Sequence, residues 1–193
     1  MELDRLEKDF LEGTVVDFGG YEYFVDPLAD GIPRVEPERL KAAARELCKL
    51  AGDGFDIILA PEAMGIHLAT AASILSGRPF TVARKRMYHL YGEVRADAHN
   101  GYSASSLFVN GITSSDRVLI IDDVIDTGST AICLAEAVRS IGASLHGIVA
   151  VYDRSRRLKE ISDSLGVPVR ALMEVGVENG KPMVYKREGR EIM

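Results

Sequence analysis

Apolar residues along the chain form short blocks that alternate with segments of helical periodicity. The short blocks are rich in β-branched residues and apolar on both faces, which is typical of strands in a parallel sheet buried on both sides. They are residues 55–60, 79–83, 118–121, 145–151 and 167–173. The segments between them repeat apolar residues every three or four positions, which predicts helices. These are residues 37–50, 66–76, 129–141 and 155–165. The alternation predicts an α/β fold with a central, parallel, twisted sheet flanked by helices.

Two segments depart from this alternation. Residues 14–28 are rich in aromatic and β-branched residues but are interrupted by Gly19 and Gly20, which predicts a β-hairpin or a partly irregular flap. Residues 84–112 are polar, and a loop of this length inside a compact domain is usually functional or mobile. This second segment opens with three basic residues in an acidic chain, so we expect a lid that binds an anion. No repeat or linker divides the sequence, and we predict a single domain over residues 1–193.

Composition narrows the class of protein. The chain has 193 residues, 47% of them hydrophobic and 27% charged, as in ordinary globular proteins. A net charge of −6 argues against binding to nucleic acid or to membrane surfaces. No apolar stretch is long enough to span a bilayer, and the charged N-terminus is unlike a signal peptide, so we expect a cytoplasmic protein. The two cysteines, Cys48 and Cys133, fall in predicted helices, and we interpret them as buried, reduced thiols.

The most informative segment is residues 118–130. An apolar strand stops at Asp122 and Asp123, and the turn at residues 126–130 then opens a helix. Open α/β sheets bind ligands at such junctions, where backbone N–H groups and the helix dipole favour a phosphate. Carboxylates this close repel one another unless a ligand or cation compensates them. The pattern therefore favours a sugar phosphate, with the turn on the phosphate and the acids on the ribose. A helix N-cap is the alternative, but a cap needs one acid rather than three.

This segment resembles the phosphoribosyl-pyrophosphate (PRPP) motif of the type I phosphoribosyltransferases. Residues 23–28, 60–67 and 84–86 extend the resemblance, which covers roughly residues 10–185 and is closest to the archaeal hypoxanthine/guanine group built on an adenine-type scaffold. The resemblance implies the type I fold, with a small hood from residues 1–30 and the C-terminal segment, and a flexible lid at residues 84–112. It also implies PRPP and a purine base as substrates, Mg²⁺ as cofactor, and a homodimer.

The resemblance assigns roles to individual residues. Asp122 and Asp123 would hold the ribose hydroxyls, while Mg²⁺ would be held mainly by PRPP with these two acids as candidate protein ligands. The 5′-phosphate site would consist of Asp126, Thr127, Gly128, Ser129 and Thr130. The pyrophosphate site would consist of Glu62, Ala63, Met64, Gly65, Arg84 and Lys85. Members of the family often have a cis or strained non-proline peptide in the 61–65 turn, and we expect one near Ala63-Met64.

Base chemistry is the last part of the resemblance. Asp126 occupies the position of the acid-base group that reaches purine N7 in hypoxanthine/guanine enzymes, which suits a 6-oxopurine protonated there. Tyr102 and Arg86 would belong to the closing lid. Adenine-type enzymes often have Glu before that tyrosine, whereas this chain has Gly101. Candidates for the base pocket are Phe24, Val25, Asp153 and Arg154.

We therefore predict phosphoribosyl transfer from PRPP to N9 of hypoxanthine, or of guanine, with release of pyrophosphate. Adenine or xanthine as the base is one alternative. A regulator that binds PRPP or a nucleotide without catalysis is another, although such proteins usually have a nucleic-acid-binding element that this sequence does not show. Comparing turnover on the four purines separates these possibilities.

Overall fold

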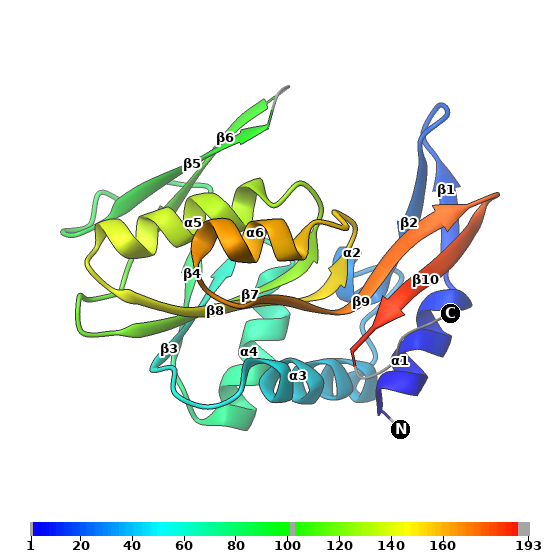
Figure 1. The fold of residues 1–193 in the computed structure, drawn as a ribbon, viewed down its shortest axis with the longest axis horizontal. Helices are drawn as coiled ribbons and strands as arrows, with labels where there is room; N and C mark the ends of the chain where they lie inside the picture. Colours follow the sequence, from blue (N-terminus) through cyan, green and yellow to red (C-terminus); the bar gives the residue numbers. More distant parts are fainter. Residues whose placement is uncertain (1, 101–102, 189–193) are drawn as a thin grey trace.

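The computed structural model of the chain describes residues 2–100 and 103–188. Its centre is a six-stranded sheet in the order β10-β9-β8-β7-β3-β4, parallel except for the antiparallel edge strand β10 (Figure 1). The strands are β3 (Ile57–Pro61), β4 (Phe80–Ala83), β7 (Arg117–Ile125), β8 (Ser144–Asp153), β9 (Val169–Glu178) and β10 (Lys181–Arg187). The predicted α/β class and central parallel sheet are thus confirmed. The prediction of a single domain stays a prediction.

Helices cover both faces of the sheet. One face carries α3 (Pro37–Ala51) and α4 (Gly65–Ser76), and the other carries α5 (Ser129–Ser140) and α6 (Leu158–Leu165) (Figure 1). Each layer encloses a hydrophobic cluster, because the strands are apolar on both faces. The second cluster includes Cys133, which is buried, whereas Cys48 is half-buried; both thiols are free. No helix in the described part of the chain is long and apolar enough to cross a membrane.

Strand order reverses between β3 and β7. From β3 the chain runs through α4 to β4 on one side, and from β7 it runs through α5 to β8 on the other. The helices that follow these two neighbouring strands lie on opposite faces, so the turns after them open side by side at the carboxyl edge of the sheet (Figure 1). Gly65 lies so near this junction that a Cβ on it would be 3.0 Å from the Ile121 carbonyl oxygen. The two turns are therefore packed together.

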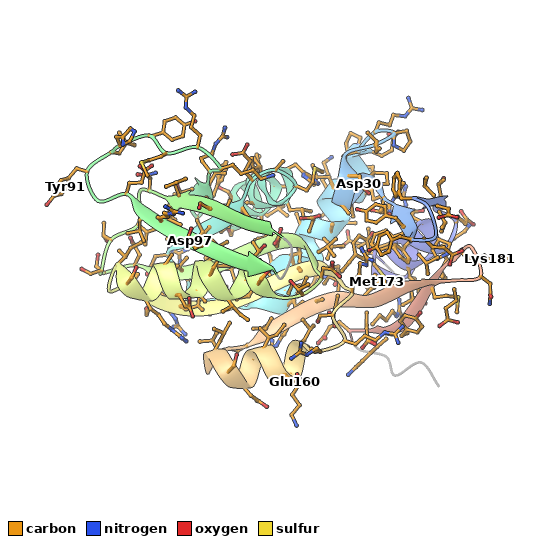
Figure 2. The ribbon with its side chains drawn as sticks, turned by 90° about the horizontal axis from the view of Figure 1, so that it is seen from above. Asp30, Tyr91, Asp97, Glu160, Met173 and Lys181 are labelled. Carbon is orange, nitrogen blue, oxygen red and sulfur yellow. The ribbon has the colours of Figure 1, made fainter. Side chains whose placement is uncertain are left out.

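The predicted lid loop at residues 84–112 is wrong as a loop. The segment contains an antiparallel β-hairpin of β5 (Val94–Asn100) and β6 (Ser103–Val109). Ala96, Leu107 and Val109 are buried in the second cluster, so regularly spaced apolar residues in a largely polar sequence hold the hairpin against the body. Figure 2 shows the hairpin, marked by Asp97, running from the end of the molecule at Tyr91 toward Asp30.

Two ends of the sequence build a smaller unit beside the sheet. Its elements are α1 (Glu2–Leu11), the hairpin of β1 (Thr14–Asp17) and β2 (Glu22–Val25), α2 (Pro27–Asp30), and the distal parts of β9 and β10. We call this unit the hood. Arg187 of β10 pairs with Asp4 and Glu7 of α1 at 2.7 and 3.0 Å. The extension of β9 and the presence of β10 were not predicted, because alternating polar residues there lack the uniform apolar signal of the central strands.

A buried polar cluster joins the hood to the body. Asp26 caps α2 by accepting a hydrogen bond from Leu28 N at 2.9 Å, and its other oxygen pairs with Arg39 of α3. Arg39 also donates a hydrogen bond to Tyr152 Oη of β8 at 3.4 Å. Desolvation raises the pKa of Asp26 even with the cation beside it. The pair therefore holds three elements in one geometry at a desolvation cost.

Removing the cation from this cluster tests its role. We expect Arg39→Met to lower the free energy of unfolding by about 3–5 kcal/mol, because the Asp26 carboxylate stays buried without its partner. The double variant Asp26→Leu/Arg39→Met should lose clearly less than the sum of the two single variants. Arg45→Met is the matched control: Arg45 lies on the same helix, is half exposed, pairs with Glu2 at 2.6 Å, and should cost under about 1 kcal/mol. Denaturant titration measures all four; equal losses for Arg39 and Arg45 would contradict the prediction.

Candidate active site

The turn between β7 and α5 has the geometry of an anion site. Residues 122 and 124–131 line a cavity of about 120 Å³. Gly128 adopts a left-handed φ of 82°, and no side chain of the described residues caps α5. A Cβ on Gly128 would lie 2.5 Å from Ile161 Cδ1, so only glycine fits. The Thr127 and Ser129 hydroxyls lie 2.9 Å apart. Backbone N–H groups at the start of α5, together with these hydroxyls, can bind a phosphate.

Two aspartates end β7 beside this turn. Asp122 is only 9% exposed, and its Oδ1 accepts a hydrogen bond from Asp123 N at 2.9 Å. Burial, followed by repulsion from Asp123, raises the pKa of Asp122 well above its usual range, and burial also raises the pKa of Asp123. The pair is thus electrostatically costly in the folded protein. A ligand that donates hydroxyl hydrogen bonds, or a cation, would offset that cost.

The turn after β3 lies next to the acidic pair. Its Glu62–Ala63 peptide is cis, one bond before the position that we expected from the resemblance. Met64 precedes the first residue of α4, and its Cε lies 3.4 Å from the position of a Cβ on Gly31 of the hood. The turn therefore touches the sheet on one side and the hood on the other.

Basic residues follow β4 and are tied to the same turn. Arg84 Nε lies 3.0 Å from Glu62 Oε2, and the same carboxylate oxygen accepts a hydrogen bond from Lys85 N at 3.0 Å. Arg84 also exchanges two backbone hydrogen bonds with Phe108 of the lid hairpin, at 2.9 and 2.7 Å. Glu62 therefore orients the segment that enters the hairpin. The Lys85 and Arg86 side chains are exposed, and Tyr102 lies outside the described residues.

The base-pocket candidates divide into two groups. Phe24 is 2% exposed and packs edge-on against Phe10 and Tyr152 in the core. Asp153 is also 2% exposed, and its Oδ1 accepts hydrogen bonds from the Ser155 backbone and hydroxyl at 2.8 and 2.6 Å. Both side chains therefore serve the local structure. Val25 is half-buried at the end of β2.

Arg154 is the candidate that faces the turn. Its backbone N–H donates a hydrogen bond to the Ile125 carbonyl at 2.8 Å, which ties the segment after β8 to the turn after β7. Its Nε lies 4.0 Å from Asp126 Oδ1, and the Asp126 side chain is 60% exposed. Asp126 is thus accessible to a ligand and has a cation beside it.

Two hood tyrosines were not assigned a role from the sequence. Arg154 donates a hydrogen bond to Tyr21 Oη, and its Cζ lies 5.7 and 5.5 Å from the ring centres of Tyr21 and Tyr23. Tyr23 also donates to Asp30 Oδ1 at 2.8 Å. Side chains alternate across a strand, so Tyr21 and Tyr23 point to the same face while Phe24 points to the core. That alternation was the signal available in the sequence.

Comparison with known proteins shows the family. Residues 36–168 match the model of the phosphoribosyl transferase domain. The chain is 41% identical over 181 residues to "Hypoxanthine/guanine phosphoribosyltransferase" of Methanobacterium paludis, covering 94% of this chain and 95% of that protein. It is 40% identical over 182 residues to the protein of the same name from Methanothermobacter thermautotrophicus, covering 94% of each.

A solved structure confirms the fold. The structure of adenine phosphoribosyltransferase from Thermoanaerobacter pseudethanolicus superposes with a TM-score of 0.72, at 23% identity, covering 88% of this chain and 99% of that one. The chain therefore belongs to the phosphoribosyltransferase family and has the type I phosphoribosyltransferase fold.

The buried acidic pair predicts how stability depends on pH. A carboxyl group whose pKa is raised by folding contributes stability that is fully present below its unfolded pKa, about 3.9, and that is lost as pH rises through the folded pKa. Without ligand at pH 8, Asp122→Asn should therefore be more stable than the natural chain by on the order of 1 kcal/mol, the equivalent of one pKa unit.

Thermal unfolding between pH 4 and pH 8 measures this effect. The gain corresponds to about 2–4 °C at pH 8 and should vanish near pH 4. Asp163→Asn, at an exposed position of α6, is the control and should change little at any pH. A destabilised Asp122→Asn at pH 8, or a gain that does not depend on pH, would contradict the assignment.

Proposed function

We propose that the protein transfers the phosphoribosyl group of PRPP to N9 of hypoxanthine or guanine, giving IMP or GMP and pyrophosphate. Relatives about 40% identical over nearly the whole chain bear the name of this activity. The structural observation that supports it most strongly is the exposed Asp126 carboxylate beside the anion-binding turn. A carboxylate can accept the N7 proton of a 6-oxopurine, whereas neutral adenine presents a lone pair at N7.

Each group in the site has a role in this proposal. The 126–130 turn binds the 5′-phosphate, and Asp122 and Asp123 accept hydrogen bonds from the ribose hydroxyls. The 62–65 turn, with Arg84 and Lys85, binds pyrophosphate. As the bond from N9 to the anomeric carbon forms, the bond from that carbon to the pyrophosphate oxygen breaks, and Asp126 takes the base proton. Closure of the lid, including Arg86 and Tyr102, would exclude water from the oxocarbenium-like sugar.

Magnesium fits this site as a partner of the substrate. Within the described residues, no cluster of three or more acidic, histidine or cysteine side chains could hold a metal ion by itself. Mg²⁺ commonly binds through one or two carboxylates together with substrate phosphates. Asp122 and Asp123, whose raised pKa values reflect an uncompensated pair, are the protein groups that would contribute. When bound, the metal would offset the charge of the leaving pyrophosphate.

Oligomeric state and location are parts of the same proposal. We infer a homodimer, which an apolar surface on α4 supports: Ile74 is 78% exposed and Leu75 is 45% exposed. Ile74 also borders a cavity of about 510 Å³ with Ile66 and Leu40. We further infer a cytoplasmic protein with PRPP and a purine as its small-molecule partners.

The choice of base is tested directly with PRPP, Mg²⁺ and hypoxanthine, guanine, adenine or xanthine, following pyrophosphate release. We expect kcat/KM for hypoxanthine or guanine to exceed that for adenine by at least about 100-fold, because a buried hydrogen-bonding group left unpaired is costly. Preference for adenine or xanthine would replace the proposed substrate. Absence of turnover on all four bases would overturn the proposed function.

Asp126→Asn tests the acid-base role. Asparagine can still accept a hydrogen bond but cannot take the proton, so kcat for hypoxanthine should fall roughly 10²–10⁴-fold while the KM for PRPP changes little. Steady-state kinetics with each substrate varied in turn measures both constants, and Asp163→Asn again provides the control. Unchanged turnover would remove Asp126 from the mechanism.

A further inference from the structure

One arginine fills the space between the hood and the PRPP turn. The Arg154 guanidinium donates a hydrogen bond to Tyr21 Oη and lies 5.5–5.7 Å from the ring centres of Tyr21, Tyr23 and Phe24. Its side chain is 18% exposed. Aromatic faces hold a guanidinium in a preferred plane. The hood hairpin therefore fixes where the donors of this side chain lie.

The other side of the guanidinium faces Asp126. Arg154 Nε lies 4.0 Å from Asp126 Oδ1, and the backbone hydrogen bond from Arg154 N to the Ile125 carbonyl, at 2.8 Å, fixes the spacing of the two residues. A rigid set of N–H donors thus stands beside a carboxylate acceptor. The two groups present a donor and an acceptor next to each other at the mouth of the same site.

A purely structural ion pair does not account for this arrangement. The 4.0 Å separation is too long for a hydrogen bond, and a pair with one partner 60% exposed contributes little stability. Among the residues that the structure describes, Nε and Nη1 of Arg154 donate no hydrogen bond, because its one side-chain hydrogen bond, to Tyr21, comes from Nη2. Arginine donors that are mostly buried and unpaired suit a ligand that offers acceptors.

We propose that Arg154 determines base specificity by donating a hydrogen bond to the 6-oxo group of the purine while Asp126 accepts one from N7–H. This inference rests on the proposed function. O6 and N7 are adjacent on one edge of the base, the edge that arginine also recognises in guanine of DNA. The pair therefore matches a 6-oxopurine that carries its proton on N7.

That protonation state is the one that reacts. A neutral hypoxanthine with its proton on N7 has a free lone pair on N9, the atom that attacks the sugar. By pairing a donor with O6 and an acceptor with N7–H, Arg154 and Asp126 select this tautomer. As N9 bonds to the anomeric carbon and pyrophosphate leaves, the N7 proton passes to Asp126, so charge and atoms balance. Arg154 acts on selection of the base and does not exchange a proton.

Adenine fails the same test at both atoms. Its amino group at C6 is a donor and would face the guanidinium donors, while its N7 is ordinarily an acceptor and would face the carboxylate. Such mismatches leave desolvated polar groups unpaired. Specificity would thus arise from a group that repels the wrong base as well as one that attracts the right one.

Two base analogues isolate the contact with O6. 9-Deazahypoxanthine and 9-deazaadenine both carry N7–H and cannot form the glycosidic bond through nitrogen, but the first has an oxygen at C6 and the second has an amino group. Calorimetry with PRPP and Mg²⁺ present gives the ratio of their dissociation constants. We expect the natural chain to prefer 9-deazahypoxanthine, and Arg154→Met to bind it about 5–150-fold more weakly, the equivalent of one base contact. Its affinity for 9-deazaadenine should not fall.

Arg154→Lys and Arg157→Met complete the design. Lysine keeps a donor and should retain part of the preference, which also covers the case in which the methionine variant folds poorly. Arg157 lies in the same loop, pairs with Glu160 at 2.8 Å and is 64% exposed, so its replacement should leave the ratio unchanged. Methionine at residue 154 keeps the aliphatic stem that packs on the hood rings.

The outcomes separate the possible roles. Equal weakening of both analogues by Arg154→Met would show a structural strut and overturn the inference. A rise in the PRPP KM with an unchanged analogue ratio would show a phosphate contact and overturn it as well. If the natural chain uses hypoxanthine but its analogue ratio survives Arg154→Met, this inference fails while the proposed function stands. Absence of turnover on any purine defeats the proposed function itself.

Discussion

The close packing of two neighbouring strand ends determines the rest of this site. β3 and β7 are adjacent and parallel, and their helices leave on opposite faces, so the turns that follow them meet at one edge. Gly65 permits this contact because its missing side chain leaves room for the Ile121 carbonyl. Gly128 does the same against Ile161 of α6. Backbone donors from two turns therefore converge beside the acidic end of β7, which no single segment could achieve.

Charge in this region is held against its own preference. Asp122 and Asp123 are largely buried and repel each other, and the cations nearby are committed elsewhere: Arg84 to Glu62, and Arg39 to Asp26. The unliganded protein thus stores an unfavourable arrangement that hydroxyl donors or a metal ion can relieve. Stability and binding oppose each other at these two residues, as is common where a site is preorganised for a charged ligand.

Sequence patterns predicted the sheet and the turns more accurately than the side-chain environments. Continuous apolar runs identify buried parallel strands, and the motif at residues 118–130 marks the junction by its composition alone. The hairpin of β5 and β6 was missed because only Ala96, Leu107 and Val109 of a polar segment face the body. Phe24 and Asp153 were placed near the base because neither pattern shows which face of a strand end is covered. Arg154 and the hood tyrosines come together only through contacts between residues more than 100 positions apart.

The same long-range pairing has a consequence for how the molecule is made. α1 is held against β10 by Arg187, which lies near the opposite end of the described chain from Asp4 and Glu7. Contacts between such distant segments form late, because the intervening chain must first be ordered. During synthesis, the nucleotide-binding turn would therefore be assembled while the first helix still waits for its partner strand to leave the ribosome. The catalytic chamber thus acquires its roof last.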